Sequence, residues 1–293
     1  MSLRRVSMRI ARAVALGAAI SHAHGAASIE QVTFPVADAV EPGSVVAGEL
    51  RVPASPRERL PAVLIVNSSP GFDGRGAFYA QALNAAGIAT LEVDWFHGRG
   101  LPVTPRHNLA HAWASLRWLA AHPRIDGARV GIMGFSWGGI VALLASSEEL
   151  ARRHAGSSAP RFAAHVALYP ICWRHHAVAA GRPGAWKELG PGVYRRVTGR
   201  PVHILAGDRD DYDGPDGCTR FVAALPPEAR RHVGLTVYPG ATFAWDSRFG
   251  SAPYEASARQ GKGGIVNVVA NPDIARQSRE FAAAWFGRRL GAR

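Results

Sequence analysis

The sequence has few residues of two chemically informative types. Among its 293 residues are two cysteines, Cys172 and Cys218, and two lysines, Lys187 and Lys262. The cysteines lack the spacing and the companion histidines of a zinc site, and no other pattern indicates a metal ion or an organic cofactor. Both are expected just past the C-terminal ends of strands. A disulfide between them and two unrelated buried thiols are equal alternatives.

The sequence also lacks low-complexity tracts, fixed-period repeats and any apolar run long enough to cross a bilayer as a helix, which takes about 20 residues. Its net charge is +12, and nearly all of its cations are arginines. These arginines are scattered, with no block of like charge and no interleaved aromatic residues. They therefore predict a solvated basic surface and no nucleic-acid partner.

The first 25 residues differ from the rest of the chain. An apolar run at residues 13–20 follows several arginines, and an A-x-A-like site follows at residues 21–23. This layout is typical of a cleavable secretory signal, with Met8 as an alternative start. It predicts a secreted or periplasmic protein with no membrane association after cleavage. The alternative is a disordered basic N-terminus on a cytoplasmic protein.

Residues 26–293 have the length of one large α/β domain, and 47% of the chain is hydrophobic. Short apolar runs alternate there with helical patterns, which predicts βαβ units and a mostly parallel sheet with helices on both faces. In such a sheet the site forms at the C-terminal ends of the strands. Strands are expected at residues 45–52, 62–67, 89–93, 130–135, 163–168, 202–206 and 233–238, and helices at 78–86, 108–121, 138–146, 218–224 and 274–290.

One motif has the pattern of a catalytic nucleophile. Gly134-Phe135-Ser136-Trp137-Gly138 matches G-x-S-x-G and lies between an expected strand and an expected helix. A nucleophile on a strained turn needs small residues two positions before and two positions after it. The motif therefore predicts Ser136 as the nucleophile. The alternative is a glycine-rich turn with an incidental serine.

An acid is expected after a later strand, and a base after the last one. Carboxylates cluster after residue 206, at Asp208, Asp210, Asp211 and Asp213, and a solvated acidic loop accounts for at least two of them. Residues 237–246 contain no histidine, and none occurs after His232. The base is therefore missing from its expected place.

Six segments occur in a characteristic order along the chain: residues 67–76, 94–100, 122–139, 169–172, 207–211 and 238–241. Together they resemble the dienelactone hydrolase family of the α/β-hydrolase superfamily, from about residue 45 to the end. The resemblance implies an α/β-hydrolase fold and action on a small-molecule ester or lactone. Dienelactone hydrolases proper use a cysteine nucleophile, whereas this chain resembles the relatives that use serine.

Carried over position by position, the resemblance implies Ser136 as nucleophile and Asp210 as acid. The backbone amides of Trp137 and Ser69 would form the oxyanion hole. The usual signature ends Tyr-Pro-Gly-Ala-x-His, so the catalytic histidine falls on Phe243. For the family's arginine clamp, Arg99 and Arg248 are only approximate candidates.

Two functions remain open on this basis. The first is an ester or lactone hydrolase that is impaired because phenylalanine cannot accept a proton, unless His97, His175 or His176 supplies a surrogate base. Each of these three is otherwise a surface histidine. The second is a non-catalytic protein that binds a small ligand in the same pocket. Residues 181–200 and 249–268 show no regular pattern, and neither the substrate nor the oligomeric state follows from the sequence.

Overall fold

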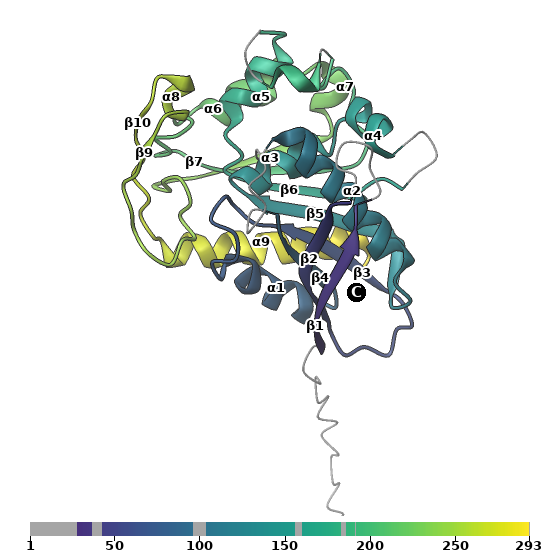
Figure 1. The fold of residues 1–293 in the computed structure, drawn as a ribbon. Helices are drawn as coiled ribbons and strands as arrows, with labels where there is room; N and C mark the ends of the chain where they lie inside the picture. Colours follow the sequence, from purple (N-terminus) through teal and green to yellow (C-terminus); the bar gives the residue numbers. More distant parts are fainter. Residues whose placement is uncertain are drawn as a thin grey trace, which may run out of the picture.

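An eight-stranded sheet forms the centre of the protein in the computed structural model (Figure 1). The structure describes residues 28–36, 43–95, 104–155, 160–182, 186–190 and 192–292, so the predicted signal segment lies outside it. The strands follow the order β1-β2-β4-β3-β5-β6-β7-β8. Their bounds are β1 (Ser28–Pro35), β2 (Val45–Val52), β3 (Leu60–Val66), β4 (Ala89–Asp94), β5 (Ile125–Phe135), β6 (His165–Leu168), β7 (Val202–Gly207) and β8 (Val233–Tyr238).

The mostly parallel sheet predicted from the alternation of elements is confirmed. From β4 to β8 every neighbouring pair is parallel, whereas β2 pairs with β4 and with β1 in antiparallel fashion. Every residue of β3 is buried, as expected for a central strand covered on both faces. Strand β1 was not expected from the sequence, because only Val32 and Phe34 among its residues are buried.

Helices cover both faces of the sheet. Helices α1 (Arg75–Ala85) and α9 (Pro272–Leu290) contact each other on one face, and α2 (Pro105–Ala121) and α3 (Trp137–Leu144) pack on the other (Figure 1). Within the described ranges, no helix combines the length and the apolar character needed to cross a bilayer. The remaining helices are α4 (Glu148–Ala155), α5 (Cys172–Ala179), η1 (Lys187–Leu189), α6 (Gly217–Ala224), α7 (Pro227–Arg230) and α8 (Ala258–Gly261).

One segment is more regular than the sequence indicates. Residues after Tyr169-Pro170 were expected to form an irregular loop, but Cys172–Ala179 is helix α5. The carboxylate of Asp213 supplies the cap that the local sequence lacks. It accepts the N–H groups of Cys172 and Trp173, each at 2.7 Å. Because this cap comes from a distant loop, no local signal marks the start of the helix.

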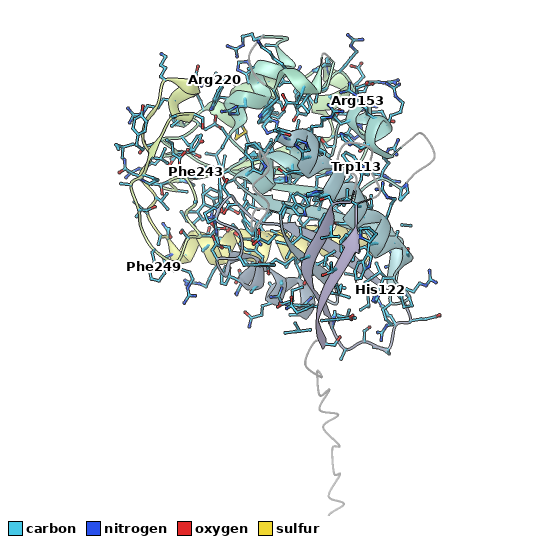
Figure 2. All side chains as sticks on the ribbon, in the orientation of Figure 1. Trp113, His122, Arg153, Arg220, Phe243 and Phe249 are labelled. Carbon is cyan, nitrogen blue, oxygen red and sulfur yellow. A yellow bond between two sulfur atoms is a disulfide. The ribbon has the colours of Figure 1, made fainter. Side chains whose placement is uncertain are left out.

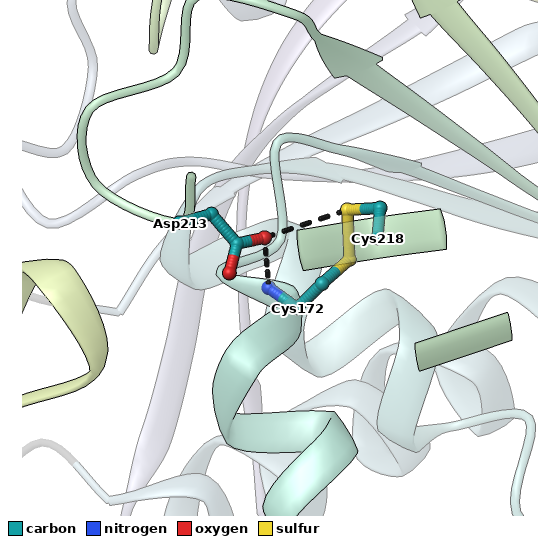
Figure 3. A group of neighbouring side chains, drawn as sticks. All are labelled: Cys172, Asp213 and Cys218. Carbon is teal, nitrogen blue, oxygen red and sulfur yellow. Dashed lines mark hydrogen bonds between the residues drawn. A yellow bond between two sulfur atoms is a disulfide. The ribbon is translucent and has the colours of Figure 1, made fainter. Parts of the chain in front are cut away.

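Cys172 and Cys218 form a disulfide that joins the first turn of α5 to the first turn of α6 (Figure 3). Of the two alternatives left open by the sequence, the structure shows the bonded one. Sγ of Cys218 lies 3.5 Å from Oδ2 of Asp213, which is a contact and not a hydrogen bond because a disulfide sulfur has no proton to donate. Since both thiols are used in the bond, this cluster offers no thiolate to a metal ion.

Removing the disulfide should destabilise the protein. The bond links residues 46 positions apart, and closing a loop of this length restricts the unfolded chain by about 4 kcal/mol. We expect the double substitution Cys172→Ala and Cys218→Ala to lower the free energy of unfolding in urea by about 3–4 kcal/mol. The same loss should follow when the wild type is reduced. A variant whose midpoint matches that of the oxidised wild type would contradict this role.

Candidate active site

Ser136 lies on the tight turn between β5 and α3. Its backbone has φ 50° and ψ −109°, a conformation that residues with a side chain rarely adopt. Its N–H donates to the carbonyl of Leu168, at the end of β6, at 3.0 Å. The hydroxyl group has no hydrogen-bond partner among the residues that the structure describes. Ser136 is therefore presented at the sheet edge, immediately before the first turn of α3.

The glycines around Ser136 leave no room for a side chain. A Cβ at Gly134 would lie 2.3 Å from the carbonyl of Gly138, and a Cβ at Gly138 would lie 2.1 Å from the carbonyl oxygen of Val66. Both distances are far below any real contact of this kind. The G-x-S-x-G spacing thus allows β5, α3 and the end of β3 to approach closely.

The two amides predicted to form an oxyanion hole start from neighbouring strands. Val66 of β3 is paired with Gly134 of β5. Ser69 and Trp137 each lie three residues beyond one member of this pair, so both amides belong to the same edge of the sheet. Ser69 is exposed in a turn, and Trp137 is the first residue of α3. A helix N-terminus and a loop amide at one place suit a developing negative charge.

Asp210 lies beyond the end of β7, and its carboxylate is buried. Its Oδ1 accepts the N–H groups of Tyr212 at 2.8 Å and of Asp213 at 3.1 Å. Its Oδ2 has no hydrogen-bond partner in the described part of the chain. Burial, reinforced by the neighbouring charge of Asp213, raises the pKa of Asp210 to about 8. The acid predicted to orient a base therefore has a free oxygen and favours its protonated form at neutral pH.

The other carboxylates of this cluster hold neighbouring loops in place. Oδ1 of Asp208 accepts the N–H of Gly240 at 2.6 Å, and Oδ2 of Asp211 accepts the side-chain amide of Asn267 at 2.6 Å. Asp208 is exposed and Asp211 is half-buried. Asp210 is thus distinguished from Asp208 and Asp211 by its burial.

Phe243 occupies the loop after β8, where the resemblance places a catalytic histidine (Figure 2). Its ring lies 5.2 Å from that of Tyr169 and 4.9 Å from that of Tyr212. Tyr169 directly follows Leu168, which accepts the Ser136 N–H, and Tyr212 follows Asp210 by two residues. Phe243 therefore packs between a residue next to the hydrogen-bond partner of Ser136 and a residue two positions beyond Asp210.

The histidines considered as surrogate bases lie in different surroundings. His175 is fully buried in α5, where its Nδ1 is hydrogen-bonded to the Tyr194 hydroxyl and its ring lies 5.1 Å from that of Trp186. Burial lowers the pKa of His175 to about 3. His176 is half-buried and is hydrogen-bonded to Arg182 at 3.1 Å. His97 lies outside the described residues. No recorded contact brings His175 or His176 to Ser136.

A buried arginine connects the loop that carries Ser69 to the rest of the site. The sequence alone did not single out this arginine. Arg75 donates to the hydroxyl of Ser68, to the carboxylate of Asp73 and, at 3.0 Å, to the hydroxyl of Tyr169. Tyr169 in turn donates to Asp246, whose carboxylate lies 3.8 Å from the Arg75 guanidinium. The network thus ties the loop that carries Ser69 to the loop that follows Phe243.

Burial and neighbouring charges shift the pKa values of Arg75 and Asp246 in opposite directions. Burial alone would lower the pKa of Arg75, but Tyr169, Asp73 and Asp246 outweigh it and raise that pKa above its ordinary value. Burial raises the pKa of Asp246, against the opposing effects of Arg75 and of the hydroxyls of Tyr169 and Tyr79. No local pattern in the sequence pairs Arg75 with Asp246, because the two residues are far apart in the chain.

Neither candidate for the family's arginine clamp is placed at Ser136. Arg99 lies outside the described residues. Arg248 is exposed and lines a hollow of about 760 Å³ between α1, α9 and the loop after Trp245. Its guanidinium lies 5.9 Å from the centre of the Phe249 ring.

Solved structures share this architecture. Thermogutta terrifontis esterase 2, phosphorylated by paraoxon, is 16% identical with a TM-score of 0.64, over 92% of this chain and 96% of that one. A putative dienelactone hydrolase from Klebsiella pneumoniae is 18% identical with a TM-score of 0.61, over 89% and 99% of the two chains. This chain has the α/β-hydrolase fold.

A third hydrolase-fold structure is a dienelactone hydrolase-like promiscuous phosphotriesterase from metagenomic libraries. It is 19% identical with a TM-score of 0.58, over 90% of this chain and 99% of that one. No protein-family model matches the sequence, and a search of curated proteins finds no match. The hydrolase fold agrees with the resemblance seen in the sequence, and at these identities it is the fold that the likeness establishes.

Asp210 should make stability depend on pH. Its carboxyl keeps a proton up to about pH 8 in the folded protein, whereas the unfolded chain releases it near 3.8. Relative to an Asp210→Asn variant, the wild type should therefore lose stability as pH rises from 5 to 8, by at most about 1.4 kcal/mol per pH unit. Urea unfolding of both proteins across this range measures the difference. Parallel curves would show that Asp210 does not hold the proton.

Arg75 should be far more important for stability than an exposed arginine. Replacing it by methionine leaves Asp246 buried without its cation, and such losses cost about 3–5 kcal/mol. Arg276→Met is the matched control, since Arg276 is exposed on α9 and pairs with Asp273. We expect the control to change the free energy of unfolding by less than about 1 kcal/mol. Equal effects of the two substitutions would be inconsistent with the network.

Proposed function

We propose that this protein is a hydrolase that cleaves a small ester or lactone through Ser136, slowly, because it lacks the usual base. One observation carries the proposal. Ser136 keeps the strained conformation of a nucleophile, at a cost on the order of 1–3 kcal/mol, on a turn too tight for any side chain at Gly134 or Gly138. A turn without a catalytic role has no need of this strain.

In this proposal the Ser136 oxygen attacks the carbonyl carbon of the ester or lactone, and its proton passes to water. The carbonyl oxygen becomes negative and accepts hydrogen bonds from the amides of Trp137 and Ser69. The bond from the carbonyl carbon to the alcohol oxygen then breaks, that oxygen takes up a proton, and the acyl group stays on Ser136. Water attacks this acyl-enzyme, which releases the acid and returns a proton to Ser136. The alcohol leaves after the first step when the substrate is an ester, and it stays joined to the acyl chain when the substrate is a lactone.

The missing base limits the rate. A serine hydroxyl attacks well only when a neighbouring group takes its proton, and Phe243 cannot. In a serine hydrolase, loss of the base costs on the order of 10⁶ in kcat and leaves roughly 10³–10⁴ over water from the oxyanion hole and binding. The burial and hydrogen bonding of His175 argue against it as a substitute.

A second candidate is a non-catalytic protein that binds a small ligand in the same place. The packing of Phe243 against Tyr169 and Tyr212 favours it, because these rings make the position of the base an apolar wall. The raised pKa of Asp210 agrees with this alternative, since a neutral acid has no imidazolium to stabilise.

An organophosphate separates the two candidates. The related esterase 2 structure is of a protein phosphorylated by paraoxon. We expect paraoxon to label this protein slowly at Ser136, as read by the mass of the tryptic peptide, and Ser136→Ala to remove the label. A folded protein that stays unlabelled after prolonged exposure would leave the binding function as the better account.

Restoring the histidine should restore fast catalysis. In Phe243→His, the imidazole can donate to the free Oδ2 of Asp210 and accept the proton of Ser136. We expect turnover of a small activated ester to rise by about 10²–10⁴. Phe243→Leu is the control and should show no gain, and Ser136→Ala should abolish the gain. An unchanged rate in a folded Phe243→His protein would mean that residues 136, 210 and 243 do not form one site.

We also propose that the protein acts outside the cytoplasm. The sequence layout of the first 25 residues supports export, and so does the disulfide between Cys172 and Cys218, since such bonds persist in oxidising compartments.

A further inference from the structure

Residues 249–270 form a two-stranded ribbon beside the candidate active site. Tyr254 pairs with Ile265 in the β9 (Tyr254–Glu255) and β10 (Gly264–Ile265) sheet, and Ser251 forms a bridge with Val268. Both pairings belong to one antiparallel register. Between them, the N–H of Val266 donates to the carbonyl of Pro253 at 2.9 Å. The segment that showed no pattern in the sequence is thus a continuous antiparallel ribbon, with α8 at its tip.

The ribbon is held on its inner side by the loop that carries Asp210. The N–H of Arg259 donates to the carbonyl of Tyr212 at 2.9 Å, and the Tyr212 hydroxyl contacts that of Ser257. Asn267 donates to Asp211. Val266 and Val268 are buried, so alternation along the strand directs Ile265 and Val269 outward.

The outer side of the ribbon is unusually apolar. Seven large hydrophobic side chains are exposed in the described part of the chain, and four of them belong to this ribbon. Three of them share the outer face, with exposed fractions of 68% for Tyr254, 56% for Val269 and 45% for Ile265. Phe249, 76% exposed, precedes the first paired residue of the ribbon. Exposed apolar side chains gathered in this way mark an interaction surface. The ribbon lies along the left side of the molecule in Figure 1, and Figure 2 labels Phe249 near its lower end.

The ribbon carries more cations than acids. Arg259 and Lys262 lie at or next to its tip against a single acid, Glu255, whereas Arg248 lines the hollow beside α1 and α9. Neither Arg259 nor Lys262 forms an ion pair with a described residue. Apolar and aromatic side chains next to such cations are the composition that binds an interface of anionic lipids.

We propose that the outer face of the 249–270 ribbon docks on an anionic lipid surface. The apolar side chains would enter the headgroup region, and Arg259 and Lys262 would face lipid phosphates. A second copy of this chain fits less well, because both copies would bring the same excess of cations to the contact. Four side chains also provide far less than the roughly 1,000 Å² that a stable interface needs. The proposal does not depend on the proposed hydrolysis.

Vesicle binding tests the proposal without any measurement of turnover. The full chain should co-sediment with vesicles of phosphatidylcholine and phosphatidylglycerol at 70:30, and at least tenfold more weakly with phosphatidylcholine alone. Raising the salt from 0.1 to 0.5 M should weaken binding several-fold. The double variant Tyr254→Ser and Ile265→Ser should lose about tenfold in affinity, and Lys262→Gln about fivefold.

Ile29→Ser is the matched control. Ile29 is 62% exposed on β1, at the opposite edge of the sheet from β8, so its loss should leave vesicle binding unchanged. Thermal unfolding checks that every variant is folded.

Three results would overturn the proposal. The first is a folded wild type that does not sediment with anionic vesicles. The second is binding that stays intact in the ribbon variants, which would assign it to another basic segment such as residues 4–12. The third is a wild type that does not bind vesicles but forms a dimer or binds an acidic protein, when the ribbon variants abolish that association.

Discussion

The close approach of three backbones around Ser136 is the constraint on which the site depends. Gly138 lies against the carbonyl of Val66, Gly134 lies against Gly138, and the Ser136 N–H is bonded to Leu168. These contacts join β3, β5 and β6 at one edge of the sheet and hold a conformation that a free chain would avoid. The amides of Ser69 and Trp137 and the loops after β7 and β8 all follow strands that end at that edge. A sheet with another strand order would scatter the same residues.

An aromatic ring, that of Phe243, lies at this edge where the resemblance expects a histidine. Phe243 fills the space between Tyr169 and Tyr212, so the loop after β8 is packed and not hollow. The nearby carboxylate of Asp210 is buried, one of its oxygens accepts no hydrogen bond from a described residue, and its pKa is raised to about 8. An acid in such a site is stabilised by a cationic partner, and Phe243 cannot be one. The α/β-hydrolase fold and the tight turn at Ser136 thus occur together with an apolar ring at the position where the resemblance expects a base.

Three sets of long-range contacts hold the loops of this edge together. On one side, the disulfide and the Asp213 cap join α5 and α6 to the Asp210 loop. On the other side, the 249–270 ribbon rests on Tyr212 and Asp211 and presents its apolar face outward. In addition, Arg75 and Asp246 connect the loop that carries Ser69 to the loop that follows Phe243. The same contacts that position the candidate site thus also shape the surface around it.

The sequence by itself determined the mostly parallel sheet, the tight turn at Ser136, a carboxylate cluster after the strand that ends near residue 206 and the absence of a histidine at residue 243. Each of these follows from local patterns: apolar runs, glycine spacing, or a residue type at the end of a strand. Only the tertiary structure decided that Cys172 and Cys218 pair, that His175 is buried in α5, that Arg75 reaches Asp246, and that residues 249–270 form a ribbon in one register. It also added β1, whose mostly exposed residues carry little alternation. The reason is physical: these features depend on partners far away in the chain, and no periodicity within a short segment records a partner.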